Sequence, residues 1–248
     1  MKYLIRVAVI VYLCFMCIHV TAQKKDENKP QQNVVKINLS ALAFKNISLQ
    51  YERAVGKRTS VAMNVRTIPM GSLAFQSVID NIVDQAFIEY DQIKVGGFGI
   101  VPEFRYYLGK KDVLQGFYIG TFVSYNNYTM SLPISYSNNT RTGIFDGKLN
   151  AVTGGLQLGA QFRLSNSLTL DWWIIGPNYG AGNGTLNLST ALSPSEQSEL
   201  KNQLENLKNE VPLNIIKSYS VSSTGATINA KGPWGGLRGL GFNLGLRF

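Results

Sequence analysis

The chain has 248 residues and a formal charge of +9, from 24 basic and 15 acidic side chains. Its two cysteines and its one histidine all lie within the first 22 residues. If that segment is removed, the remaining protein has no thiol and no imidazole. This excludes disulfides, the usual zinc or copper sites and histidine-dependent catalysis. The basic residues are spread along the chain without a basic helix, so we expect no nucleic-acid partner.

Residues 1–22 have the features of a secretory signal peptide. Lys2 and Arg6 precede an apolar run at 7–18, and Val20-Thr21-Ala22 fits a cleavage site. The apolar run is too short for a membrane-spanning helix. Cleavage lowers the formal charge from +9 to +7. We therefore expect three parts: the signal peptide at 1–22, a polar leader at 23–32, and one β-barrel domain at 33–248.

Apolar and polar residues alternate along much of the chain. In "VVKINLSALAF", for example, Val35, Ile37 and Leu39 alternate with Lys36 and Asn38. This period of two is typical of strands with two different environments on their faces. It predicts eight strands, at 34–44, 47–55, 60–68, 96–108, 116–130, 149–164, 168–176 and 241–248. In 116–130 both faces are apolar, and we expect Phe117, Ile119, Thr121 and Val123 to point outward.

The first link, at 44–46, is expected to be short, and from the second link onward short and long links alternate. Short links are expected at 56–58, 109–115 and 165–167, and long ones at 69–93, 133–146 and 181–232. All long loops then emerge at one end of an up-and-down antiparallel meander, which is the layout of a transmembrane β-barrel with short periplasmic turns. Ten strands are an alternative, because 184–192 and 220–231 either form a further hairpin or extend the last two strands.

Two of the long links carry helix signals. In 193–211, Ser193 is a good N-cap, Pro194 occupies the first helical position and Glu196 completes a capping box. Residues 72–90 also have apolar residues at helical spacing. Each helix is either a lid that binds a partner or a helix that packs on the barrel rim or on the other helix. The apolar stripe of the first comprises Leu200, Leu204, Leu207 and Val211.

The alternation fits either a soluble barrel with an apolar interior or a membrane barrel with a polar interior. Strands of about ten residues match a tilted bilayer span. Aromatic residues are available for the membrane interfaces: Tyr51, Tyr106, Tyr107, Tyr125, Trp172 and Trp173. In a membrane barrel the charged face is interior, where Glu52, Arg66, Glu103, Arg105 and Asp171 must pair. We interpret them as a structural charge network rather than a proton or ion relay, with Lys36 and Arg163 near strand ends and hydrated.

The last eight residues, "GFNLGLRF", resemble the C-terminal β-signal that the assembly machinery of bacterial outer membranes reads. Phe242, Leu244, Leu246 and Phe248 form its outward row. The layout of 33–248 is similar to the small OmpA-, OmpX- and OmpW-like barrels. The opening stretch with Tyr51-Glu52-Arg53 also resembles a family of uncharacterised outer-membrane barrels. The resemblance implies location in the outer membrane of a Gram-negative cell, and closure by pairing of the last strand with the first.

The expected partners follow from charge and location. They are outer-membrane lipid and lipopolysaccharide, the barrel-assembly machinery during biogenesis, and an extracellular partner that the loops would contact. Without histidine, and without a strand-to-helix glycine loop for phosphate, we expect no enzymatic activity, no cofactor and no metal. Two functions stay open: a structural or surface-interaction scaffold that displays long loops, and a narrow passive channel or binding conduit for small or apolar molecules.

Overall fold

A computed structural model of the chain describes residues 31–72, 92–109, 113–136 and 140–248. Residues 32–248 form one compact unit. The expected signal peptide, most of the polar leader and nearly all of the helix expected at 72–90 lie outside the described residues.

The described chain is all-β and antiparallel, with eleven strands and few helical segments. The helical segments are α2 (Leu39–Ala43), α4 (Pro194–Glu210) and the short 3₁₀ helix η2 (Pro212–Asn214). The strands are β1 (Asn33–Asn38), β2 (Ile47–Ala54), β3 (Thr59–Ser72), β4 (Lys94–Tyr107), β5 (Gly116–Tyr136), β6 (Arg141–Arg163), β7 (Leu168–Ile175), β8 (Pro177–Ser189), β9 (Ile216–Ser222), β10 (Gly225–Leu237) and β11 (Gly241–Arg247).

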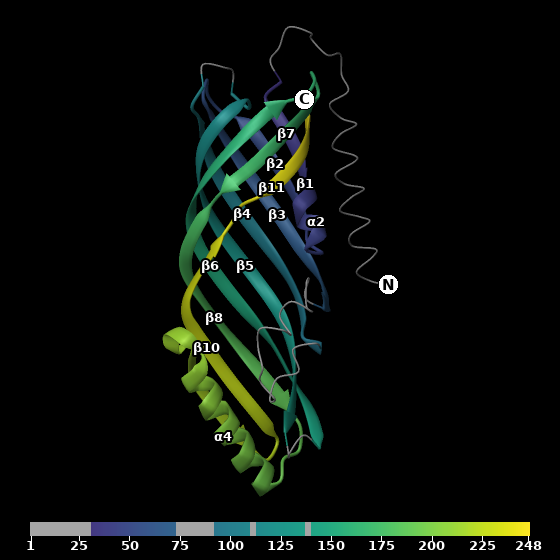
Figure 1. Ribbon diagram of the computed structural model, residues 1–248, viewed down its shortest axis with the longest axis vertical. Coiled ribbons are helices and arrows are strands. Elements are labelled where there is room, and N and C mark those ends of the chain that lie inside the picture. The colour runs from purple at the N-terminus through teal and green to yellow at the C-terminus, as the bar shows by residue number, and fades with distance from the viewer. Residues whose placement is uncertain (1–30, 73–91, 110–112, 137–139) are drawn as a thin grey trace. The chain divides into compact units, whose positions relative to one another are not determined.

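The strands form one sheet that closes on itself. Hydrogen-bonded pairing runs β5-β4-β3-β2-β1-β11-β7-β6, and β6 also pairs with β5, which completes a closed ring. As expected, the last strand pairs with the first, from Val34 opposite Arg247 to Asn38 opposite Asn243. Figure 1 shows β11 between β1 and β7, at the end of this unit that carries the C-terminus. Each strand of the ring is therefore paired along both edges over these lengths.

The number of strands differs from the expected eight because three strands continue the sheet beyond the ring. Only Gly176 separates β7 from β8, and only 238–240 separate β10 from β11. β6 pairs with β8, β8 with β10, and β10 with β9. Of the two stretches in doubt, at 184–192 and 220–231, residues 184–189 of β8 pair with 225–230 of β10, with Thr185 opposite Asn229, whereas 220–222 belong to β9. We call β8, β9, β10 and the adjoining residues 127–136 of β5 and 141–150 of β6 the extension sheet.

The long loop expected at 133–146 is mostly strand. β5 and β6 have 21 and 23 residues and pair from Gly116 opposite Gln161 to Tyr136 opposite Arg141. A bilayer span needs only about 9–11 residues of a tilted strand. The alternation of apolar and polar residues is weaker in 131–136 and 141–148 than in the ring. The prediction from alternation alone therefore ended β5 too early and began β6 too late.

The first strand is shorter than expected because a helix replaces its second half. β1 ends at Asn38, and α2 occupies Leu39–Ala43. Asn38 Oδ1 accepts a hydrogen bond of 2.7 Å from the backbone N–H of Ala41, so Asn38 caps the helix. Asparagine favours this position because its side chain satisfies an N–H that a helix start leaves unpaired.

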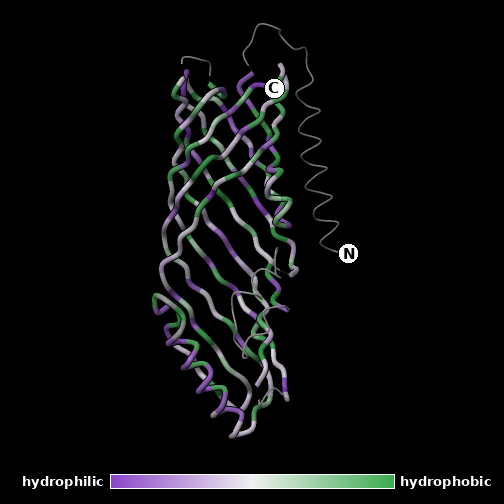
Figure 2. The backbone as a smooth tube through the Cα atoms, viewed as in Figure 1, coloured by the Kyte–Doolittle hydropathy of each residue, from purple (hydrophilic) through white to green (hydrophobic). Residues whose placement is uncertain are grey.

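The two faces of the ring differ in polarity as the alternation predicts. Outward residues of the ring strands are mostly apolar and at least partly exposed, and inward residues are mostly polar and buried. Figure 2 shows this as hydrophobic and hydrophilic residues alternating along the strands. Phe117, Ile119, Thr121 and Val123 point outward, as expected. The expected interfacial positions of Tyr107 and Trp173 were wrong: they are only 1% and 5% exposed, because they share the inward parity of Arg105 and Asp171.

Helix α4 confirms the helix expected at 193–211. Ser193 is its N-cap, with Pro194 in the first turn and a capping box to Glu196. Leu200 and Leu204 are buried against strands of the extension sheet, including Phe145 of β6 and Ile228 of β10. Figure 1 shows α4 beside β10, away from the end that carries the C-terminus. The apolar stripe of α4 is thus covered by this chain's own strands. None of the helices in the described ranges is long and apolar enough to cross a membrane.

Candidate functional site

The interior of the ring holds a cluster of buried charges centred on Arg105. Its guanidinium forms ion pairs with Asp171 at 2.8 Å, Glu103 at 2.8 Å and Glu52 at 3.2 Å. These residues come from β2, β4 and β7 and meet because each occupies an inward position. The ring of Tyr118 lies 4.4 Å below the guanidinium carbon, which adds a cation–π contact. Four of the five predicted charges therefore lie in one place.

Arg66, the fifth predicted charge, lies elsewhere on the interior face. Its Nε donates to Asn126 Oδ1 at 3.1 Å. In the β3–β4 pairing Ser60 is opposite Arg105, whereas Arg66 is opposite Gly99. These two β3 positions are six residue steps apart, which corresponds to about 20 Å of strand. Among the described residues, no ion pair joins Arg66 to the others.

Lys36 belongs to the cluster, so the expectation that it stays hydrated was wrong. It is 1% exposed, and its ammonium forms ion pairs with Glu52 and with Asp171, the latter at 2.5 Å. β1 is short, but it pairs on both sides, with β2 and β11, and these neighbours enclose its inward side chains. Arg163 is exposed, as expected.

Arg238 completes the cluster and was missed by the sequence analysis. It lies in the break between β10 and β11, and its guanidinium forms an ion pair of 2.5 Å with Glu103. The guanidinium carbon lies 3.5 Å from the centre of the Trp173 ring. Its flanking sequence, "GLRGLG", carries no alternation that would have assigned it to the interior. We call Lys36, Glu52, Glu103, Arg105, Asp171 and Arg238 the interior ion cluster.

The interior ion cluster balances three cations with three carboxylates, and uncharged groups satisfy the carboxylates further. Tyr118 donates to Asp171 Oδ1 at 2.8 Å, and Tyr107 donates to Glu52 Oε1 at 2.7 Å. Gln161 Oε1 accepts from Lys36 at 3.0 Å. Such pairing offsets the several kcal/mol that each buried ion loses in desolvation. Within the described ranges, no group of three or more metal-ligating side chains could hold a metal ion.

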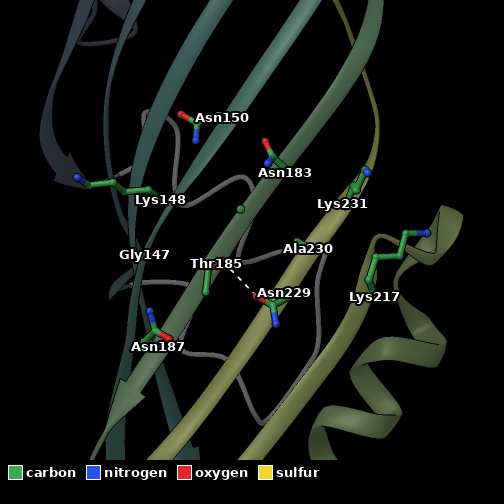
Figure 3. Close-up of a pocket in the computed structure, with 11 residues that line it drawn as sticks. Gly147, Lys148, Asn150, Asn183, Thr185, Asn187, Lys217, Asn229, Ala230 and Lys231 are labelled. Atoms are coloured by element: carbon green, nitrogen blue, oxygen red, sulfur yellow. Dashed lines mark hydrogen bonds between the residues drawn. The ribbon is translucent and has the colours of Figure 1, made fainter.

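A polar depression of ≈ 700 Å³ lies on the outward face of the extension sheet. Figure 3 shows its residues on four neighbouring strands, with Thr185 donating to Asn229 at 3.2 Å. We call it the outer groove. Its polar residues are Lys148 and Asn150 of β6, Asn183, Thr185 and Asn187 of β8, Lys217 of β9, and Asn229 and Lys231 of β10. The signal for it in the sequence is asparagine and lysine at positions that continue the apolar outward rows.

The start of α4 holds a carboxylate with an unusually low pKa. Glu196 accepts hydrogen bonds of 2.8 Å from both the backbone N–H and the hydroxyl of Ser193, and of 2.6 Å from Arg141 on β6. The backbone and side-chain bonds from Ser193, together with the guanidinium of Arg141, lower the pKa of Glu196 to about 2. These contacts stabilise the charged form and tie α4 to β6.

The C-terminal strand is held along both edges. β11 pairs with β1 on one side and β7 on the other, and Phe248 exchanges two backbone hydrogen bonds with Asn33, of 3.0 and 3.1 Å. The outward row of Phe242, Leu244, Leu246 and Phe248 is between 37% and 56% exposed. The apolar row therefore belongs to a fully paired strand.

A family model described as "Protein of unknown function (DUF3575)" matches residues 8–184, more than two thirds of the chain. The chain belongs to this family. The match covers β1 to β7 and the first part of β8, so it spans most of the ring and part of the outer groove. No curated protein and no solved structure matches the chain.

Proposed function

We propose that the protein is a sealed outer-membrane β-barrel without enzymatic activity, and that its closed ring anchors the extension sheet at the cell surface as an interaction scaffold. Eight of the eleven strands form the ring, and their outward rows are apolar where a bilayer would contact them. An export signal at 1–22 and the β-signal-like end of β11 support this location.

The ends of the ring support an orientation. The turns at 55–58 and 164–167 and the C-terminus lie at one end, and β8, β9, β10 and α4 extend from the other. Outer-membrane barrels keep short turns on the periplasmic side and long segments on the outside. The extension sheet and α4 therefore project from the cell.

The observation that carries the scaffold proposal is the interior ion cluster. Glu52, Arg105 and Asp171 have no exposed surface, and they lie two or three residues from the short-turn ends of β2, β4 and β7, inside a ring narrow enough for side chains to fill. An ion that crossed the ring would have to break several of these pairs at once. A buried pair that loses one partner costs about 3–5 kcal/mol. The cluster therefore works as a seal.

Conductance in planar lipid bilayers tests the seal. The wild-type protein is expected to give no discrete current steps. The double variant R105S/D171S removes one charge of each sign and truncates both side chains, so steps are expected to appear. The matched control K57Q/R163Q alters exposed residues at the short turns and should remain silent. Stable steps from the wild type that disappear when the interior charges are neutralised would contradict the sealed scaffold.

Fractionation and gel mobility test location and closure separately. The folded protein should pellet with the outer membrane, and an unboiled sample should migrate at a different position from a boiled one in SDS gels. Identical migration would speak against a closed barrel, whatever the bilayer recordings give.

A shallow recess on the outward face of the ring wall is the observation behind the second candidate, a conduit for apolar molecules. It has a volume of ≈ 530 Å³ and is lined by residues that include Met63, Pro102, Phe104 and Val123. Pro102 has no N–H to donate, and the pairing of β4 with β5 is interrupted at this point, between Ile100 and Glu103. Uptake of an apolar dye into proteoliposomes tests this function. If the protein is a conduit, the wild type should take up the dye, and M63W should take up less because the tryptophan fills the recess. If it is a sealed scaffold, neither the wild type nor M63W should take up the dye.

A further inference from the structure

The outer groove combines three lysines with a row of side-chain amides. The ion pairs found among the described residues involve none of Lys148, Lys217 and Lys231. Asp146 is the nearest acidic residue on the same face of β6, two positions beyond Lys148. The groove thus offers an excess of positive charge that no folding contact uses. Such a patch fits an anionic ligand.

The groove begins where the apolar outward rows end. On β6, Val152, Leu156 and Leu158 are exposed and apolar, and the next two outward residues toward the extension are Asn150 and Lys148. The step from Val152 to Asn150 is two residues, about 7 Å along the strand.

The same step occurs in register on the neighbouring strands. Val152 pairs with Tyr125 of β5 and Ala181 of β8, whereas Asn150 pairs with Asn127 and Asn183. An apolar rung therefore lies directly beside a polar rung. In a ring that spans the membrane, this change marks the level at which hydrocarbon gives way to head groups.

The arrangement within the groove matches a sugar flanked by phosphates. Figure 3 shows Asn183, Thr185 and Asn229 along the middle, and Lys148 and Lys217 extending toward opposite sides. Amides and hydroxyls both donate to and accept from sugar hydroxyls. Lysine ammonium groups bind phosphate as point charges. A head group with phosphates at both ends of a disaccharide would contact both kinds of residue at once.

We propose that the outer groove binds the phosphorylated disaccharide head group of lipopolysaccharide in the same membrane. The proposal rests on the proposed function, because it needs the ring in the outer membrane with the extension sheet outside. Binding would fix the depth of the ring and cover the lysine-rich face of the extension sheet with the surrounding glycolipid.

Binding of the purified full-length protein in detergent to lipopolysaccharide tests the proposal. The triple variant K148Q/K217Q/K231Q is compared with the wild type and with the control K57Q/K201Q/K208Q, which removes the same charge elsewhere. We expect the first triple variant to bind at least about tenfold more weakly, since each lost charged hydrogen bond has roughly that effect. The control should bind like the wild type. Wild-type affinity of K148Q/K217Q/K231Q would overturn the proposal.

The ligand source is tested by three further probes with the wild type: lipopolysaccharide treated with phosphatase, inorganic phosphate, and a soluble anionic polysaccharide. Phosphatase treatment should weaken binding by a similar factor, and the two soluble probes should compete poorly. Undiminished binding after phosphatase treatment, or equal binding of a soluble probe, would refute the glycolipid assignment.

Gel mobility and fractionation of the same variants separate this proposal from the proposed function. If K148Q/K217Q/K231Q folds and fractionates with the outer membrane but binds lipopolysaccharide like the wild type, the proposed binding by the outer groove is wrong and the scaffold proposal is unaffected. If the wild-type protein does not fractionate with the outer membrane, both the groove proposal and the proposed function are wrong.

Discussion

Replacement of Arg105 by methionine should destabilise the ring strongly. Arg105 is fully buried and forms ion pairs with Glu52, Glu103 and Asp171. Methionine fills part of the volume but leaves three carboxylates facing two cations. Loss of one partner of a buried ion pair costs about 3–5 kcal/mol in unfolding free energy. This corresponds to roughly two to three and a half orders of magnitude in the folded-to-unfolded ratio.

Urea unfolding of the protein in detergent micelles or vesicles measures this effect. At a slope of about 2 kcal/mol/M, a loss of 4 kcal/mol lowers the unfolding midpoint by about 2 M urea. The control R163M changes an exposed arginine at a short turn and should shift the unfolding free energy by no more than about 0.5 kcal/mol.

A charge-balanced double variant separates electrostatics from packing. R105M/D171N leaves Lys36 paired with Glu52 and Arg238 paired with Glu103. The double variant should therefore be more stable than R105M alone, although it carries one more substitution. If instead the second change only adds to the loss, or if R105M unfolds at the wild-type midpoint, the reasoning about buried charge is refuted.

Three further predictions concern assembly, close packing and pH. Deletion of Phe248 should lower the amount of assembled protein in outer-membrane fractions more than it lowers total synthesis, and unchanged assembly would remove the β-signal argument. Gly180→Ala would bring a Cβ to 2.0 Å from the carbonyl oxygen of Val152 and should cost about 1–3 kcal/mol in urea unfolding. Gly154→Ala is its control, since the nearest atom there is at 3.9 Å. Hydrogen bonds from Ser193 lower the pKa of Glu196 to about 2, below the usual value of 4.5. The charged carboxylate therefore stabilises α4 fully above pH 4.5, and this stabilisation is lost as the pH falls toward 2. Pepsin cleavage of α4 should therefore be slower in the wild type than in E196Q at pH 5, with the difference vanishing near pH 2; a constant difference would contradict it.

The alternation of the sequence was sufficient to predict most of the ring. A strand places successive side chains on opposite faces, so the polar row that contains Glu52, Arg105 and Asp171 had to share one side of the sheet. The cap of α4 was predictable for a similar reason, because Ser193, Pro194 and Glu196 act within one helical turn. Local patterns of this kind need no knowledge of the fold.

The sequence patterns predicted the structure wrongly where a long-range contact or a competing local hydrogen bond determines the conformation of a segment or the position of a side chain. Leu39–Ala43 continues the alternation of β1, yet Asn38 caps it as a helix. Tyr107 and Trp173 have the amphipathic character of interface residues, but their parity directs them inward. Arg238 has no period to follow, and its place against Glu103 and Trp173 depends on how β10 joins β11.

The sequence by itself determined that the chain forms an antiparallel sheet with one apolar and one polar face, and that its last strand carries an apolar outward row. Only the tertiary structure decided how far the sheet continues beyond the ring, which charges meet inside it, and that lysines and asparagines from β6, β8, β9 and β10 form one groove. The physical reason is that alternation fixes the face on which a side chain lies, whereas its neighbours depend on the register between strands far apart in the chain.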